Sequence, residues 1–537
     1  QIHDPERMES FPAPIHGLIA GEKDTFDLRL VLETAPAFGI VGEEVTYRVR
    51  AEAIGTPKAP LGQRVPALLA IDGGAPRPFL LEVGETTDLV IEIEHGGPTV
   101  VDVQLPPHPD EMTDRNNRII ATVNGVRDRL RVLLVSGEPH PGGRTWRDLL
   151  KSDPTVELIH FTILRPPAKQ DGTPVNELSL IAFPTRELFL EKISGFDLIV
   201  FDRYRWRGVL SSTYLANVAR YVQQGGAVLV ASGPAFSGAQ SLNRTPLNEV
   251  LPAVPTVNVI EKGYKPQVTD LGQRHPVTAG LAPLTGDPDW GQWLRQIEVE
   301  PRSGHVVMSG DSDRPLLILD RVGEGRVALL ASDHAWLWSR GYDGGGPQAD
   351  LLRRVAHWLM REPELEEEAL FARVDGDKVL VERRSLDEEG PDAVSARPPD
   401  GGAPQTLRYE SAGPGRWQAV LDGADQGLWR LEDGDARAVA AVGPPSPAEY
   451  ANPLASAALL TPLAEATRGS IAWLGDGLPS LRAVSEDRRS AGRDWIGMVA
   501  RDAHRVTGVR LTDLLPAWLA AMMIGLLMLV AWLREGR

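Results

Sequence analysis

Short alternating runs of apolar and polar residues fill residues 25–126. Within each run every second position is apolar, and Gly, Pro, Asn or Asp separates one run from the next. Six runs at intervals of about 8–12 residues are typical of an antiparallel sandwich, so we predict an immunoglobulin-like β-sandwich here. The runs are DLRLVLE, EEVTYRVRAEAI, PALLAIDGG, TDLVIEIEHGG, TVVDVQL and NRIIATVNG.

The pattern changes at residue 127, where nearly continuous apolar runs begin to alternate with amphipathic segments. Fully apolar strands indicate a sheet that is covered on both faces, and alternating strands and helices indicate parallel βαβ units. We therefore predict a flavodoxin-like doubly wound parallel sheet over residues 127–365. The runs that carry this prediction are DRLRVLLVSG, GRTWRDLLKS, VELIHFTIL, FPTRELFLEKI, FDLIVFDRY, SSTYLANVARYVQQGG, AVLVASG, RVALLASD and QADLLRRVAHWLMREP.

Shorter strand-like runs return over residues 366–443, where Asp375-Gly376 and Asp433-Gly434 are typical hairpin turns. We predict a second small β-domain there, so that two β-sandwich domains flank the α/β domain. Residues 444–510 are rich in Pro, Ala and Gly and are predicted to be a linker with short helices. Residues 1–24 hold one strand-like run; we interpret them as the remnant of an upstream domain in a processed or partial chain that begins at Gln1.

An uncharged apolar segment, Leu514–Leu533, lies close to the C-terminus. Its 20 residues are long enough to cross a hydrocarbon core of about 30 Å as a helix. Trp518 and Trp532 stand near its two ends, as interfacial aromatic residues do. We predict a transmembrane helix with a short tail over residues 511–537, and we favour an extracytoplasmic location for the bulk of the chain.

Composition narrows the choice of function. The formal net charge of −17 disfavours a nucleic-acid partner, because binding to phosphates favours a basic surface. The chain has no cysteine, which excludes thiolate nucleophiles, disulfides and zinc–thiolate sites. No spacing of histidines and carboxylates predicts a metal site, and no cofactor is expected.

The candidate chemistry lies at the ends of the predicted parallel strands, where open α/β sheets bind their ligands. These ends are Ser136-Gly137-Glu138, Asp202-Arg203, Ser232-Gly233 and Asp333-His334. Ser232 follows a buried strand at a small-residue turn, so one hypothesis is a serine hydrolase with His334 as base and Asp202 as its orienting group. The turn is Ala-Ser-Gly rather than Gly-x-Ser-x-Gly, which instead favours Ser232 and His334 as structural residues.

Two further features suggest binding surfaces. The loop GEPHPGGR precedes a helix that could hold a small anion or a carbohydrate, through Gly137, Glu138, Gly142, Gly143 and Arg144. Aromatic residues and an arginine in glycine-rich loops are typical of protein contacts, although they also occur in cores under loops. The residues concerned are Trp290, Trp293, Trp336, Trp338 and Arg340.

Several longer motifs resemble bacterial membrane proteins of the glutamine amidotransferase-like kind. They are LRVLLVSGEPHPGGRTWRDLLKSDP, FDLIVFDRY, YVQQGGAVLVASGP, HPVTAGL, WGQWLRQI, GEGRVALLASDHAWLW and the terminal LREGR. The resemblance implies a von Willebrand A-type domain, of which residues 1–24 would be the remnant. It also implies an immunoglobulin-like domain, an amidotransferase-like α/β domain, a small β-domain and an anchor in the inner membrane.

Genes of such proteins often neighbour a MoxR-type AAA+ ATPase, which implies a role in a periplasmic envelope assembly. Class I amidotransferases use a cysteine at the strand-end turn, but this chain has Ser232 there and no cysteine. We therefore expect a catalytically inactive amidotransferase-like domain in a scaffold or binding protein that contacts other envelope proteins. The serine hydrolase and the anion- or carbohydrate-binding module are the alternatives.

Overall fold

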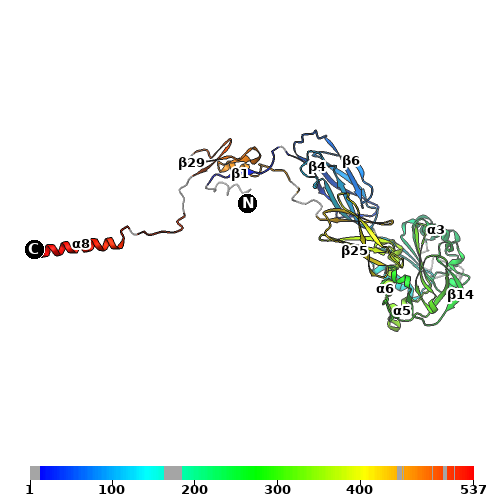
Figure 1. Cartoon of the computed structure of the whole chain (residues 1–537). Helices are drawn as coiled ribbons and strands as arrows, with labels where there is room; N and C mark the ends of the chain where they lie inside the picture. The colour runs from blue at the N-terminus through cyan, green and yellow to red at the C-terminus, as the bar shows by residue number, and fades with distance from the viewer. Residues whose placement is uncertain are drawn as a thin grey trace, which may run out of the picture. The chain divides into compact units, whose positions relative to one another are not determined.

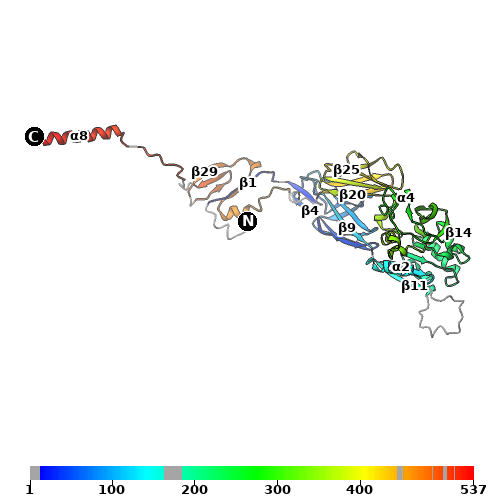
Figure 2. The same ribbon diagram turned by 90° about the horizontal axis from the view of Figure 1, so that it is seen from below.

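A computed structural model describes residues 13–23, 25–127, 129–162, 184–443, 450, 453–485, 488–499, 505–512 and 514–536. The first half of the segment predicted as an upstream remnant, residues 1–12 of 1–24, lies outside these residues. Contacts divide the chain into two units, one formed by residues 26–453 and the other by residues 1–25 with 454–537. Figures 1 and 2 show the elements of both units.

Two sheets over residues 26–126 share one apolar core, which contains Phe26, Tyr47, Leu81 and Ile119. The six predicted strand runs coincide with β2, β4, β5, β7, β8 and β9, whereas β3 and β6 were not predicted. The first sheet contains β2 (Phe26–Thr34), β4 (Glu44–Gly55) and β7 (Thr86–Glu92). The second contains β3 (Phe38–Ile40), β9 (Arg118–Val126), β8 (Gly97–Gln104), β5 (Arg64–Ile71) and β6 (Arg77–Glu82), in spatial order.

An eight-stranded sheet forms the centre of the next domain. Its first five strands are parallel: β11 (Val156–Thr162), β10 (Leu130–Ser136), β12 (Leu198–Asp202), β13 (Ala227–Ala231) and β19 (Gly325–Leu330). Antiparallel pairing then adds β18 (Pro315–Val322), β17 (His305–Ser309) and β15 (Gln267–Val268). A separate antiparallel pair joins β14 (Ala253–Ile260) to β16 (Gln296–Pro301).

Helices cover both faces of this sheet because side chains alternate along each strand. The alternation is clear in β10, where Leu134 belongs to the core that includes Trp146 and Leu351, and Val135 belongs to the core that includes Leu215. The helices are α2 (Pro141–Ser152), α3 (Ser212–Gln223), α4 (Asp270–Arg274), α5 (Trp336–Ser339) and α6 (Gln348–Leu359). Figure 2 shows α2 beside β11.

Short helical turns account for one difference from the sequence prediction: the helix expected at FPTRELFLEKI is only a five-residue π-helix, η2. The short turns are η2 (Glu187–Glu191), η3 (Ile193–Gly195), η4 (Pro234–Ser237), η5 (Leu242–Arg244), η6 (Pro246–Glu249), η7 (Asp311–Asp313), η8 (Tyr342–Gly344), η9 (Pro363–Leu365) and η11 (Leu474–Asp476).

Two four-stranded sheets follow and enclose a core that contains Val381 and Trp429. The turns Asp375-Gly376 and Asp433-Gly434 join neighbouring antiparallel strands, and both glycines have a positive φ. The first sheet contains β20 (Ala369–Asp375), β21 (Lys378–Arg384), β25 (Arg416–Leu421) and β24 (Glu410–Gly413). The second contains β23 (Gln405–Arg408), β22 (Ala393–Arg397), β26 (Gly427–Asp433) and β27 (Ala436–Val442).

The second unit contains a small β-structure where the sequence predicted a linker with short helices. β1 (His16–Ile19) pairs in parallel with β28 (Ser470–Trp473). The His16 ring contacts the Ser470 hydroxyl and the Gly497 carbonyl, both at 3.1 Å. The other elements are α7 (Thr461–Ala466), β29 (Ser480–Val484), β30 (Ala491–Gly492) and β31 (Trp495–Val499). Strands of two to five residues show too little alternation to be recognised in the sequence.

The apolar C-terminal segment forms the helix α8 (Ala517–Glu535). Its 19 residues have a mean hydropathy of 1.9, and none of that window is buried against the rest of the chain. The helix begins three residues later than the predicted apolar segment because Pro516 is its N-cap. By length and composition α8 can cross a membrane.

A buried apolar contact joins the first sandwich to the two sheets after the α/β domain. Leu428 of β26 is wholly buried and packs with Val100 and Ile120. Beside it, Arg118 binds the Asp102 carboxylate at 2.7 Å and donates to the Pro399 carbonyl at 3.3 Å. This contact makes the stability of the two domains interdependent.

Leu428→Ala is expected to destabilise the first unit by about 2–5 kcal/mol, because it leaves a cavity where no solvent-exposed surface existed. Leu380→Ala is the matched control, since Leu380 is 39% exposed and its removal should cost less than about 1 kcal/mol. Chemical denaturation of the detergent-solubilised chain, followed by tryptophan fluorescence, measures both. Equal losses for the two variants would contradict a packed junction.

Candidate functional site

The predicted strand ends meet at one edge of the sheet. The pairing register places Ser136 of β10 beside Asp202 of β12, Asp202 beside Ala231 of β13, and Ala231 beside Leu330 of β19. The residues that follow these positions are therefore brought together by the parallel pairing alone. The expectation that the strand-end side chains share one edge holds in the structure.

Asp202 is the centre of a buried polar network at this edge. Its Oδ2 accepts a hydrogen bond from His140 Nε2 at 2.6 Å and another from Ser136 Oγ at 3.4 Å. The other ring nitrogen of His140 accepts from the Gly142 amide at 3.2 Å, so the His140 side chain caps α2. Because Nδ1 accepts, the ring proton of neutral His140 lies on Nε2 and points at the carboxylate.

His160 extends this network from the neighbouring strand β11. Its Nε2 lies 3.2 Å from Ser136 Oγ and 3.1 Å from Thr162 Oγ1. Burial, together with the positive charge of Arg147, lowers the pKa of His160, and the Asp202 charge only partly opposes this. His160 therefore stays neutral at neutral pH. His140 contacts Asp202 and His160 contacts Ser136, so the fold brings both histidines into one polar network.

Ser232 and His334 do not form a nucleophile–base pair. The Ser232 hydroxyl is buried and donates to the Leu330 carbonyl at 2.8 Å, whose oxygen also accepts from the Ser232 amide. His334 instead contacts its neighbour Asp333, at 3.7 Å, and packs edge-on against Trp336. Burial lowers the pKa of His334. These contacts disfavour the hypothesis of a catalytic triad formed by Ser232, His334 and Asp202.

Two arginines surround a buried carboxylate at the same edge. The fully buried Asp333 side chain lies 3.2 Å from Arg203 Nη1 and 3.2 Å from Arg295 Nη1. Arg203 also binds Glu138 at 2.5 Å, and Arg205 binds Glu138 at 3.2 Å. The backbone of Arg203 is left-handed, with φ of 47°, which turns its side chain towards these acids. Arg295 directly precedes β16. No pattern in the sequence predicted that it would belong to this site.

A cavity of about 10 Å³ remains beside Asp202, with room for one water molecule. It is lined by Gly142, Thr145, Trp146, Asp202, Ala231, Leu330, Ser332, Asp333, Ala335, Trp336, Gln348 and Leu352. Asp202 Oδ1 and Gln348 Nε2 are buried there without a protein partner. An acceptor and a donor that face the same cavity can both be satisfied by one bridging water. The sequence indicated Asp202 but gave no reason to choose Gln348.

The predicted anion-binding loop is occupied by the chain itself. Gly142 and Gly143 are buried in the first turn of α2, and the His140 ring takes up the Gly142 amide. Glu138 is neutralised by the two arginines described above, and Gly137 is packed so closely that an added Cβ would lie 2.2 Å from the Arg203 carbonyl. Of the five residues that were predicted to bind the ligand, Arg144 alone is exposed. These contacts correct the prediction of an anion or carbohydrate site at this helix N-terminus.

Most of the predicted contact tryptophans belong to the core. Trp290, Trp293 and Trp338 are buried, with ring centroids 5.1 Å apart for Trp290–Trp338 and 4.9 Å apart for Trp293–Trp338. The Trp338 indole donates to the Gly291 carbonyl at 2.7 Å. The three tryptophans pack against one another beneath the glycine-rich loops, so their side chains are not accessible to a partner. Trp336 is half-buried, and Arg340 is exposed.

Comparison with known proteins identifies part of this domain. A family described as "Putative glutamine amidotransferase" (GATase1_like) matches residues 194–360, a range that includes Asp202, Ser232 and His334. The chain therefore contains a GATase1-like domain. The match begins after β10 and α2, so it does not include Ser136 or His140. No curated protein matches the chain.

Similar solved structures are distant. A cytoplasmic protein of Salmonella typhimurium LT2 is 17% identical with a TM-score of 0.32, over 43% of this chain and 99% of its own. A second cytoplasmic protein of Salmonella typhimurium is 18% identical with a TM-score of 0.32, over the same shares. An exo-beta-1,4-mannosidase of an Opitutaceae bacterium is 15% identical with a TM-score of 0.24, over 43% of this chain and 36% of its own. We draw no conclusion about function from these likenesses.

The neutral histidines at the strand ends give a testable pH dependence. His160 and His334 have pKa values below 6.5 in the folded protein, so the unfolded chain binds more protons as the pH falls. Stability from these residues is present above about pH 6.5 and decreases below it. His160→Gln and His334→Gln should each flatten the decline in denaturation midpoint between about pH 6.5 and 5. An unchanged slope in both variants would contradict this assignment.

Proposed function

We propose that this chain is a membrane-anchored binding or scaffolding protein whose GATase1-like domain does not hydrolyse glutamine. The observation that carries the proposal is the identity and the hydrogen bonding of the residue that follows β13. Ser232 stands there with its hydroxyl bound to the Leu330 carbonyl, and the chain has no cysteine. Amidotransferases of class I need a thiolate at this position, which this chain cannot supply.

The volume at the strand ends also supports an inactive domain. Pockets for small molecules usually enclose about 300–1,000 Å³, whereas the cavity beside Asp202 encloses about 10 Å³. The side chains that would surround a substrate bind one another instead, through the ion pairs of Asp333 and Glu138. A serine hydrolase would need the same space, so this arrangement disfavours that alternative too.

We further propose a flavodoxin-like doubly wound sheet for the α/β domain and an immunoglobulin-like fold for the first sandwich. The spatial order β11-β10-β12-β13-β19, with helices on both faces, supports the former. The two sheets that share one core over residues 26–126 support the latter. We also propose that residues 1–24 derive from a von Willebrand A-type domain. This proposal rests on the family resemblance alone, because in the structure β1 pairs with β28.

The location and partners are proposed from α8 and from the resemblance. α8 would anchor the chain in the inner membrane, with its larger unit on the periplasmic side. There it would hold other envelope proteins through its exposed surfaces. Arg340 is the predicted contact residue that stays exposed, and Tyr342, two residues further along the same loop, is exposed as well. These two side chains are the candidate contact residues.

Purified full-length protein is expected to release no ammonia from L-glutamine above the rate in buffer. Ser232→Ala should not change this result, and Ser232→Cys should stay inactive because its thiol replaces a buried hydroxyl without opening a substrate cleft. A coupled glutamate dehydrogenase assay, with an active glutaminase as positive control, measures the release. Activity in the wild type that Ser232→Ala abolishes would overturn the proposal of an inactive domain.

Affinity purification from gently solubilised membranes is expected to recover a reproducible set of envelope proteins. Arg340→Ala/Tyr342→Ala should lose part of that set, because both changes remove exposed contact area without disturbing the core. Val420→Ala is the matched control on a different domain, since Val420 is also exposed. If mass spectrometry finds no protein enriched over a tag-only preparation, the scaffold proposal fails.

A further inference from the structure

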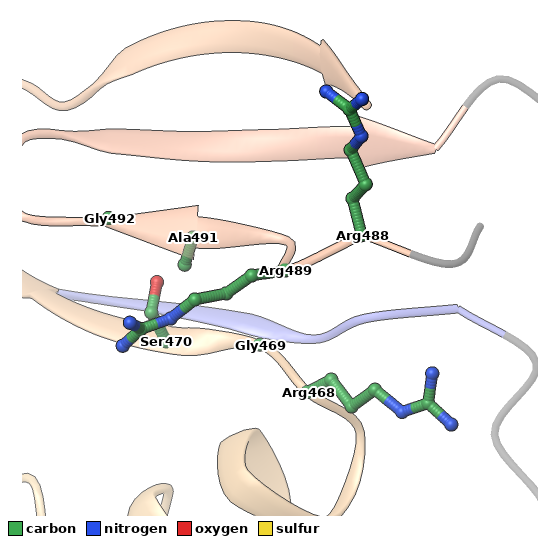
Figure 3. Close-up of a pocket in the computed structure, with 7 residues that line it drawn as sticks. All are labelled: Arg468, Gly469, Ser470, Arg488, Arg489, Ala491 and Gly492. Atoms are coloured by element: carbon green, nitrogen blue, oxygen red, sulfur yellow. The ribbon is translucent and has the colours of Figure 1, made fainter. Parts of the chain in front are cut away.

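The small second unit contains a cavity of about 370 Å³. It is lined by Arg468, Gly469, Ser470, Arg488, Arg489, Ala491 and Gly492. Figure 3 shows Arg489 lying beside Ser470, while Arg488 and Arg468 extend from other parts of the wall. Three arginines therefore line this open cavity, and their side chains extend from it in different directions.

The charge of this cavity is uncompensated among the residues that the structure describes. No acidic residue lines it. Among the described residues of this unit, the ion pair is between Lys23 and Asp476, which do not line the cavity. Elsewhere arginines such as Arg203 and Arg314 bind carboxylates directly. Glu486 and Asp487 precede the arginine pair in the sequence but are outside the described residues. Three arginines that line one cavity give it a local positive charge in a chain of net charge −17, and such a charge attracts anions.

Arg468 is held at the cavity by an unusual backbone. It follows Thr467, the C-cap of α7, and has φ of 57°. Glycine is the usual residue at this position of a helix end, because a side chain strains the left-handed conformation. Glycine would avoid this strain, so Arg468→Gly can remove the side chain without a cost in backbone conformation.

The hydrogen bonds of the wall leave the arginines as the available donors. If His16 Nε2 donates to the Gly497 carbonyl, His16 Nδ1 accepts from the Ser470 hydroxyl. The Ser470 proton is then used within the protein, and an incoming ligand meets guanidinium N–H groups. Arginine forks match phosphate oxygens in geometry and charge, and a phosphate with a small substituent fits a cavity of this size.

We propose that this arginine-lined cavity binds a phosphate group. Two sources share this chemistry: the headgroup of an anionic phospholipid and a soluble phosphate. The lipid source rests on the proposed membrane anchor. Residues 500–516 join β31 to α8, and their chain length limits the distance between the cavity and a membrane-inserted α8 to at most about 60 Å.

The test uses the full chain in nonionic detergent, so that it does not depend on membrane insertion, on protein partners or on glutamine chemistry. Isothermal titration calorimetry measures binding of inorganic phosphate and of short-chain dihexanoyl-phosphatidylglycerol. Arg488→Gln/Arg489→Gln is expected to weaken binding at least about tenfold, because charge-assisted hydrogen bonds are lost. Arg505→Gln/Arg510→Gln removes the same charge outside the cavity and should change affinity less than about twofold.

Arg468→Gly is a second variant, which separates a loss of binding from a loss of folding. It should weaken binding about threefold or more while the thermal midpoint stays the same or rises, because glycine relieves the left-handed strain. Tighter binding of the phospholipid than of phosphate identifies a headgroup site, and the reverse identifies a soluble phosphate. The proposal is overturned if neither ligand binds below about 10 mM, or if the control variant loses as much affinity as the cavity variant.

Discussion

Asp333 sets the constraint on which the edge of the α/β sheet depends. A carboxylate without solvent contact is tolerated only when cations and hydrogen bonds replace its water, and here Arg203 and Arg295 both lie 3.2 Å from it. Arg203 comes from the end of β12 and Arg295 from the segment before β16, so one buried charge links distant segments. Removing one partner from such a group costs about 3–5 kcal/mol. The edge is therefore held closed by electrostatics as well as by packing.

This closure is the structural basis of our proposal that the GATase1-like domain is inactive. Open α/β sheets bind ligands outside the carboxyl ends of their strands. In this chain the corresponding space is filled by His140, Trp336 and the Asp333 ion pairs, and what remains encloses about 10 Å³. A filled edge is compatible with the scaffold role that we propose. The arginine-lined cavity of the second unit, in contrast, is open and has spare charge.

Pattern alone predicted much of the architecture. Long apolar strands such as β10, β12, β13 and β19 were recognisable because burial on both faces leaves few polar positions in them. Strand ends at Ser136, Asp202, Ser232 and Asp333 followed directly from those strands. Short strands in the second unit were missed, since a run like β30, with two residues, has no period. The tryptophans were ambiguous because the same aromatic residues serve cores and interfaces.

The sequence by itself determined the long apolar strands, the apolar helix near the C-terminus, the lack of any thiol and the polar residues that end the parallel strands. These properties depend on local periodicity and composition, which are written along the chain. Tertiary structure decided the partners of those residues: Ser232 with a backbone carbonyl, His140 with Asp202, and Arg295 with Asp333. It also decided that Arg468 joins Arg488 and Arg489 at one cavity. Such pairings depend on strand register and chain crossing, which bring together residues that no local pattern connects.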